Sequence, residues 1–275
     1  AEVPPTEVAP GQWRWILSDL APVKLERQMP PWRGIAGRMV LSLQPPGGAG
    51  GGFRSWQEVG TWYQGLVHGR RDASPQIREK AQQLSAAAAD PLGKMQALAA
   101  YVQKDIRYVA IELGVGGVQP HAAAEVLAHG YGDCKDKVTL LSSVLNEVGV
   151  ESYYVLINTE RGSVMADTPP NLGFNHAVIA IRLPAGIDVS KLPAAITHKS
   201  LGALLFFDPT HPLIPLGHLP GALQANYGVL VNASGGELIP LPQTALALNG
   251  VERTAQLTLD ENGTLHGGVR ETWSG

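Results

Sequence analysis

The stretch Gly130-Tyr-Gly-Asp-Cys134-Lys-Asp-Lys137 runs directly into a predicted helix that stops at Gly149. Apolar residues recur behind the cysteine at three- and four-residue steps, which predicts an amphipathic helix with one buried face. Cys134 lies four residues before Val138, which begins that apolar stripe, so both side chains share the buried face. The cysteine also lies in the first turn, where the positive end of the helix dipole favours a thiolate. This position indicates a reactive nucleophile.

The alternative for any lone cysteine is that it is a small buried hydrophobe. Around Cys134 the polar neighbours Asp133, Lys135, Asp136 and Lys137 argue against a passive core position. We expect the last three of these to form a solvated face at the helix start, with one of them at the rim of a cleft. The nucleophile is the favoured interpretation.

The composition is that of a globular chain. The 275 residues are 44% hydrophobic and 16% charged, and the net charge is −3. There is no dense Lys/Arg stripe, which argues against a nucleic-acid partner. A single cysteine excludes an intramolecular disulfide framework and a cysteine-rich zinc site. No apolar run is long enough to span a bilayer, and the composition decides neither the compartment nor the oligomeric state.

The sequence pattern predicts three regions. Residues 1–45 carry β-like alternation interrupted by prolines, which predicts the end of an N-terminal β module. Residues 46–245 carry helices first and strands second, which predicts an α+β core, preceded by a glycine-rich linker at 45–52. Residues 246–275 predict a hairpin around Glu261-Asn-Gly263 and the start of a C-terminal β module. Because the chain lacks an initial methionine and stops in mid-pattern, we interpret it as a fragment of a longer protein.

Within the core, capping residues mark the helix starts. Ser55, Ser74 and Asp90 each precede a predicted helix, and the last two are followed by proline at the first helical position. A further short helix is expected at 122–129. Strands are expected at 107–111, 153–157, 174–183, 204–208, 227–231 and 237–241.

A nucleophilic cysteine needs a base and a third group that holds the base. His176 lies inside a predicted strand; alone, such a histidine is more often a satisfied core residue. Asp208 ends an apolar strand, where aspartate is common turn chemistry. The order Cys134, His176, Asp208, with about 40 and about 30 residues between members, is the layout of a papain-like Cys-His-Asp site. This joint arrangement favours catalysis.

At these positions the sequence resembles the transglutaminase-like superfamily, on three blocks: Gly132-Asp-Cys-Lys-Asp-Lys137, Phe174-Asn-His176 and Phe207-Asp-Pro-Thr210. The similarity is to its bacterial branch, in which β modules of unknown function flank the core, and it covers most of residues 50–235. By position it implies that Cys134 is the nucleophile, His176 the general base and acid, and Asp208 the group that orients the imidazole. It also implies a papain/transglutaminase-like core.

The resemblance implies acyl transfer on a peptide or protein amide through a thioester. Crosslinking and hydrolysis, the latter by a cysteine protease or amidase, use the same intermediate, and both stay open. The tetrahedral oxyanion needs hydrogen-bond donors, and the backbone N–H of Cys134 is one candidate. Candidates for the second donor are Gln119, Tyr131 and Tyr108.

No cofactor or metal is expected. His211 and His218 lie near Asp208 but lack a third ligand, and no calcium loop is evident, so the calcium dependence of animal transglutaminases does not transfer. Trp56 and Trp62 are expected to pack helices and not to form a substrate platform. Two other classes stay open: a non-catalytic binding or assembly module that retains the fold, and a regulatory thiol. The family resemblance weakly favours an extracytoplasmic location.

Overall fold

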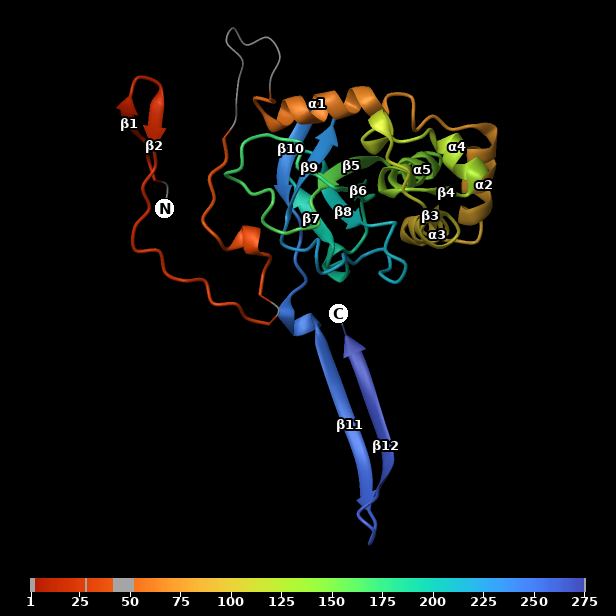
Figure 1. Cartoon of the computed structure of the whole chain (residues 1–275). Coiled ribbons are helices and arrows are strands. Elements are labelled where there is room, and N and C mark those ends of the chain that lie inside the picture. The colour runs from red at the N-terminus through yellow and green to blue at the C-terminus, as the bar shows by residue number, and fades with distance from the viewer. Residues whose placement is uncertain (1–2, 28, 42–51, 275) are drawn as a thin grey trace.

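The centre of the protein is a six-stranded antiparallel sheet in the order β10-β9-β5-β6-β8-β7 (Figure 1). The computed structural model describes residues 3–27, 29–41 and 52–274. The strands of this sheet are β5 (Ser152–Ile157), β6 (His176–Arg182), β7 (Ala195–His198), β8 (Gly202–Phe207), β9 (Tyr227–Asn232) and β10 (Gly235–Pro240). The predicted α+β core is present.

The described chain has five α-helices, of which α1 and α5 contact this sheet. They are α1 (Trp56–Val67), α2 (Pro75–Ser85), α3 (Pro91–Lys104), α4 (Ala123–His129) and α5 (Cys134–Asn146). The predicted caps are formed, because Ser55, Ser74 and Asp90 each accept a hydrogen bond from the backbone N–H three residues further on. Helix α5 contacts β5 and β6 on one side and α2, α3 and α4 on the other. Its residues 134–145 are therefore all buried, which makes α5 the central helix of the core.

Helix α1 packs directly onto the edge strand β10. A Cβ atom added at Gly60 would lie 2.0 Å from the backbone nitrogen of Gly236, and one added at Gly236 would lie 2.2 Å from the Trp56 carbonyl oxygen. Both glycines are needed because the two backbones touch here. The contact fixes the position of α1 relative to the sheet.

Two local predictions in the core need correction. The strand expected at 107–111 is limited to β3 (Arg107–Tyr108), which pairs in parallel with the equally short β4 (Tyr131–Gly132). Strand β7 was not expected, because its sequence Ala-Ile-Thr-His is short and lies within a loop-like stretch. It pairs with β8 and forms the edge of the sheet.

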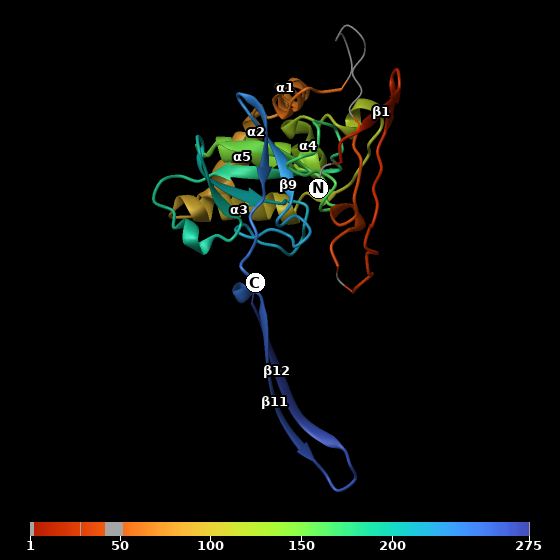
Figure 2. The ribbon, with the colours of Figure 1, turned by 90° about the vertical axis from the view of Figure 1, so that its left-hand side faces the viewer.

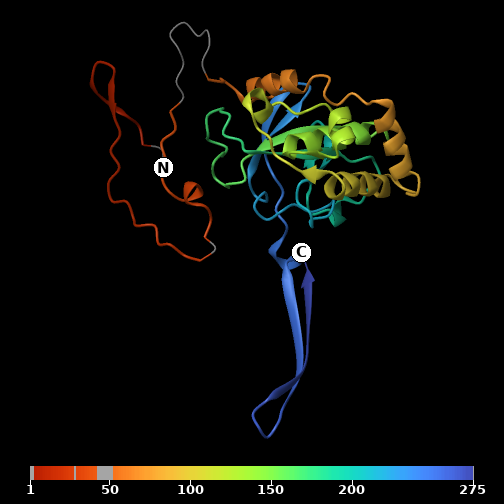
Figure 3. The same ribbon diagram turned by 45° about the vertical axis from the view of Figure 1, so that its right-hand side comes forward.

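The N-terminal segment runs as a separate arm beside the core (Figure 3). It contains the small hairpin β1 (Thr6–Ala9) and β2 (Gln12–Arg14) and a 3₁₀ turn at Trp32–Gly34. The further strands expected up to residue 43 are absent from the described residues, so that prediction is wrong there; prolines interrupt the segment and no neighbouring sheet pairs with it. Arg38 holds the arm to the core through the Gly162 carbonyl and the Thr168 hydroxyl.

The linker predicted at 45–52 lies, apart from Gly52, outside the described residues. The C-terminal hairpin is formed as predicted, by β11 (Gly250–Leu259) and β12 (Leu265–Ser274). Figures 1 and 2 show it projecting away from the core, and all its strand residues are exposed. In the described part of the chain, no helix combines the length and apolarity that crossing a membrane requires. The division into three regions stays a prediction.

Candidate active site

Helix α5 presents Cys134 at its first residue. The carboxylate of Asp133 accepts a hydrogen bond from the Asp136 N–H at 3.2 Å, and the carboxylate of Asp136 accepts one from the Asp133 N–H at 3.2 Å. This reciprocal capping box holds the start of the helix in one conformation. The backbone N–H of Cys134 is one of the first four of the helix, which have no carbonyl partner within it, so it is available to a ligand.

The solvated face expected at Lys135, Asp136 and Lys137 is wrong, because all three side chains are buried. Lys135 forms an ion pair with the buried carboxylate of Asp133. Asp136 accepts hydrogen bonds from the backbone N–H and the ring Nδ1 of His121, at 2.8 and 3.1 Å. The charges enter the core because every one of them has a partner.

Lys137 is 1% exposed and reaches the end of the neighbouring helix α3. Its ammonium donates to the carbonyl oxygens of Gln103 at 3.2 Å and Ile106 at 2.8 Å. Burial lowers the pKa of Lys137 to about 8, against a smaller opposing effect from the negative charge of Asp208. Lys137 therefore ties α5 to α3 directly beneath the candidate site.

The sheet brings His176 and Asp208 together. His176 is the first residue of β6, and Asp208 follows the last residue of β8. Because these strands are antiparallel neighbours, with Ile179 opposite Phe207, the start of one lies beside the end of the other. The His176 Nε2 atom lies 3.0 Å from the Asp208 Oδ2 atom.

Asp208 and Cys134 lie on either side of the His176 ring. Burial alone would lower the pKa of His176, but hydrogen bonds to Asp208 and to Cys134, with their negative charges, outweigh it and raise this pKa to about 10. Since Nε2 faces Asp208, Nδ1 is the ring nitrogen left for the thiol. Burial opposes ionisation of Asp208, but its hydrogen bonds and ion pair with His176, together with hydrogen bonds from Thr210, lower its pKa. The arrangement stabilises the charged form of the His176 ring.

A cavity of about 270 Å³ opens at the thiol. Cys134, Lys135 and His176 supply its reactive side. The remaining lining comes from α1, the segment 112–118, β5, the loop before β6 and β6 itself. It consists of Trp62, Tyr63, Glu112, Gly117, Val118, Leu156, Leu172, Phe174, Asn175 and Ala177. The thiol and the His176 ring therefore line one cavity together.

The three residues expected as candidates for the second oxyanion donor lie outside the cavity at Cys134. The amide of Gln119 donates to the Leu66 carbonyl oxygen at 2.9 Å and is thereby engaged elsewhere. Tyr131 stacks on the His129 ring. Tyr108 is half exposed, and burial together with negative charge at Cys134 and other acidic groups raises its pKa to about 12. None of the three is among the residues that line the cavity.

Tyr63 was missed by the sequence analysis, although it lines the cavity beside Cys134. Its hydroxyl is buried and has no hydrogen-bond partner in the structure. Burial first, and then negative charge at Tyr154, Cys134 and Asp133, raise its pKa well above the ordinary value. Tyr63 therefore stays protonated as an unused donor close to the thiol. The helical spacing of α1 marked it only as a packing residue.

The two tryptophans of α1 differ. Trp56 packs against the Phe174 ring, at 6.0 Å between centroids, as expected for a packing residue. Trp62 packs against the core and the Tyr63 ring, as expected, and it also lines the cavity. Of the two tryptophans, Trp62 alone is among the residues that line this cavity.

Within the described residues there is no group of three His, Cys, Asp or Glu side chains placed to hold a metal ion. His211 caps its own loop, since its Nδ1 accepts hydrogen bonds from the backbone N–H groups of Leu213 and Ile214, at 3.3 and 3.2 Å.

The structure brings a helix-start cysteine, a histidine on the neighbouring sheet and an aspartate bonded to that histidine together, in the arrangement expected for a papain-like cysteine site. Residues 78–185 match the model of the transglutaminase-like superfamily, which confirms the predicted resemblance over this part of the core. The matched range contains Cys134 and His176 but ends before Asp208. The match supports a cysteine-dependent enzyme at the level of the superfamily.

Two solved structures have distant similarity to the chain. One is a "putative protease" from Parabacteroides distasonis ATCC 8503, with a TM-score of 0.46 and 15% identity over 66% of this chain and 31% of that one. The other is a "putative cysteine protease" from Cytophaga hutchinsonii, with a TM-score of 0.36 and 14% identity over 74% of this chain and 50% of that one. The chain thus spans half or less of each. No curated protein matches the chain.

Proposed function

We propose that the protein transfers the acyl group of a peptide or protein amide through a thioester on Cys134. The observation that carries the proposal is the contact of His176 Nε2 with Asp208 Oδ2 at 3.0 Å, on a ring that also hydrogen-bonds to Cys134. It orients the imidazole so that its other nitrogen serves the thiol. Asp208 is the orienting residue, and His176 is the base and acid.

In the first half-reaction, the Cys134 sulfur attacks the amide carbon while its proton resides on His176. The tetrahedral intermediate collapses when His176 gives this proton to the leaving nitrogen, which departs as ammonia or an amine and leaves the thioester. In the second half-reaction, His176 takes a proton from water or an amine as that nucleophile attacks the thioester. The C–S bond then breaks, the sulfur leaves with the electron pair, the proton stays on His176, and the acid or the new amide is released. Hydrolysis and crosslinking differ only in this second nucleophile.

The oxyanion of each tetrahedral intermediate requires donors placed before the reaction. The backbone N–H of Cys134 is the first donor, and we assign Tyr63 as the second. A buried hydroxyl without a partner costs roughly 1–3 kcal/mol in the folded protein. Its position in the lining of the catalytic cavity supports a role in which the partner arrives with the substrate.

The reaction is tested by incubating the protein with a glutamine-bearing peptide and a labelled primary amine. Amine incorporation indicates crosslinking, whereas release of ammonia or cleaved peptide without incorporation indicates an amidase or protease. Cys134→Ser and His176→Ala must abolish either product. If the wild-type protein gives neither product with a panel of peptides, and no thioester is trapped by hydroxylamine, the non-catalytic binding module is the better account.

The Tyr63 assignment is tested by Tyr63→Phe. Loss of one oxyanion donor lowers kcat by about 10²–10³-fold in known cases, and we expect a fall of at least about tenfold here. Stability should be unchanged or higher, because the substitution removes an unpaired buried hydroxyl. The matched control is Tyr154→Phe: this hydroxyl bonds to Thr139 at 2.8 Å, so its loss should lower stability and leave kcat nearly unchanged. A Tyr63→Phe enzyme with full kcat would refute the assignment.

A further inference from the structure

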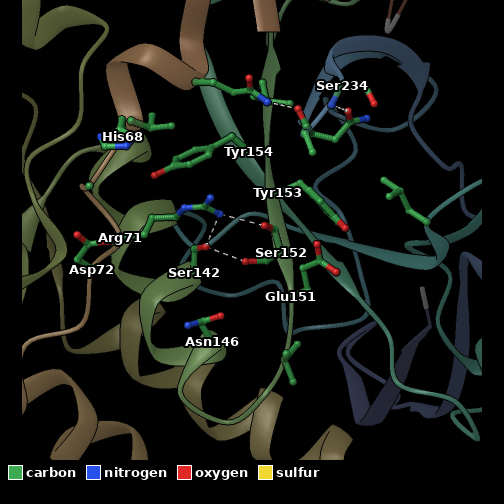
Figure 4. A pocket seen from close by; sticks show the side chains of 18 of the residues that line it. His68, Arg71, Asp72, Ser142, Asn146, Glu151, Ser152, Tyr153, Tyr154 and Ser234 are labelled. Carbon is green, nitrogen blue, oxygen red and sulfur yellow. Dashed lines mark hydrogen bonds between the residues drawn. The ribbon is translucent and has the colours of Figure 1, made fainter. Parts of the chain in front are cut away.

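A second cavity, of about 670 Å³, lies elsewhere on the core and shares no lining residue with the cavity at Cys134. It is bounded by the end of α1, the loop that follows α1, the second half of α5, the start of β5 and the turn between β9 and β10 (Figure 4). Its volume is in the range of cavities that bind small molecules. The function proposed above uses none of its side chains.

Arg71 is the fixed cation of this second cavity. One terminal nitrogen, Nη1, donates to the Ser142 hydroxyl at 3.2 Å and to the Ser152 carbonyl oxygen at 3.1 Å. The guanidinium carbon lies 5.5 Å from the centre of the Tyr154 ring. Two hydrogen bonds and the ring contact hold the guanidinium in one orientation, with its plane set by the protein.

The hydrogen bonds of the Arg71 guanidinium given above all involve Nη1. Among the described residues, Nε and Nη2 of Arg71 have no protein partner, and no carboxylate forms an ion pair with it. The nearby Glu151 is bound to Arg182 at 2.8 Å. Figure 4 shows the Asp72 carboxylate lying away from the guanidinium. Nε and Nη2 together form the edge that binds a planar oxyanion through two parallel hydrogen bonds.

Other polar groups surround this edge. The side chains of Asn146, Ser234 and His68 line the same cavity and can bond a polar ligand beyond its anionic group. The apolar part of the lining comes from Val67, Val150 and other aliphatic side chains. A ligand with one oxyanion and a mixed polar and apolar body therefore matches the cavity.

We infer that this cavity is a binding site for a small ligand or chain end that carries a carboxylate or phosphate, held by the free edge of Arg71. The shared chemistry is the oxyanion. Its source is either the carboxylate of a peptide or organic acid, or a phosphate group. The site is independent of Cys134, so it does not rest on the function proposed above.

Binding is tested by NMR titration of the ¹⁵N-labelled chain with N-acetylglycine, N-acetylglycinamide and inorganic phosphate. N-acetylglycine carries a carboxylate where its amide carries a neutral carboxamide. Because Arg71 should bind the carboxylate, we expect the amide to bind at least about tenfold more weakly. Shifts should cluster at Arg71, Ser142 and Ser152 and should persist in Cys134→Ala. The tighter of N-acetylglycine and phosphate identifies the class of oxyanion.

Substitutions at Arg71 provide a second test of the inference. Arg71→Met should weaken the favoured oxyanion at least about tenfold, whereas Arg71→Lys, which keeps the charge but loses the planar edge, should weaken it less. Arg78→Met is the control, since Arg78 lies outside the cavity lining and pairs with Glu147 at 3.6 Å. The inference is overturned if neither oxyanion shifts the cavity residues of the wild-type chain, if the amide binds equally well, or if a folded Arg71→Met binds unchanged.

Discussion

At the residue scale, Cys134 lies between two buried ion pairs. On the sheet side are His176 and Asp208, whose side chains are 11% and 7% exposed. On its own helix the neighbouring Lys135 is paired with Asp133. Removing one member of a buried pair leaves an uncompensated charge, which typically costs about 3–5 kcal/mol. Variants at these positions must therefore be checked for folding before a loss of activity is attributed to chemistry.

The protonation of His176 is the first quantity to measure. NMR titration should find the ring charged through neutral pH, with a pKa of about 10 instead of the ordinary 6.5. Asp208→Asn should lower this value more than Cys134→Ala does, because the contact with Asp208 contributes more. A neutral ring at pH of about 7.5 in the wild-type chain would contradict the assigned contacts.

The same shift has a consequence for stability. The pKa of His176 is higher in the folded state than in the unfolded chain, so the folded state holds the proton more tightly. The pair therefore contributes stability that is fully present below the ordinary value of 6.5 and is lost as the pH rises through about 10. His176→Gln removes this pH dependence from the free energy of unfolding.

The sequence could predict part of the site because three residues have local signatures. Cys134 begins a helix, His176 begins a strand, and Asp208 follows a strand. Tyr63 has no such signature, since it meets the cysteine only through packing between α1 and α5. The burial of Lys137 could not be predicted from the sequence either, because its hydrogen-bond partners are backbone carbonyls at the end of another helix.

At the element scale, the position of α1 depends on its glycines. Gly60→Ala places a methyl group against backbone atoms of β10 that cannot move independently, so we expect a loss of at least about 2–3 kcal/mol in the free energy of unfolding. Gly65→Ala in the same helix is the control. No atom lies within 4 Å of its added Cβ, so it should stabilise by about 0.4–1 kcal/mol.

Denaturant unfolding of both variants measures these changes. Equal effects of the two substitutions would show that α1 does not contact β10 as closely as described. Because Tyr63 and Trp62 belong to this helix, a displaced α1 should also reduce activity in any Gly60→Ala protein that still folds.

Predictions of helices and strands succeeded where the signal is local. Capping residues mark the helix starts at Ser74 and Asp90, and a long apolar run marks β5. They failed where pairing depends on distant partners. β-like alternation in residues 12–43 did not produce the expected strands in the described part, since a strand needs a neighbour and this segment finds only the short pair β1–β2. β7 forms because β8 offers it an edge.

At the scale of the whole molecule, the hairpin β11–β12 makes the smallest contribution to the core. Its apolar residues share one face, because Val251 lies opposite Trp273 and Leu259 opposite Leu265 in the register, and all four are exposed. Removing residues 250–275 should therefore leave the thermal midpoint of the core unchanged, since no apolar area of the core is uncovered. A lower midpoint in calorimetry would reveal contacts between hairpin and core.

The central claim is that His176 activates Cys134, and the rate of alkylation by iodoacetamide as a function of pH tests it most directly. The account predicts that at about pH 6 the wild-type thiol is alkylated much faster than the thiol of the His176→Ala protein, because His176 accepts the thiol proton. His176→Ala should lose most of the rate at the lower pH and keep it at about pH 9. The same pH profile for both proteins would contradict the account.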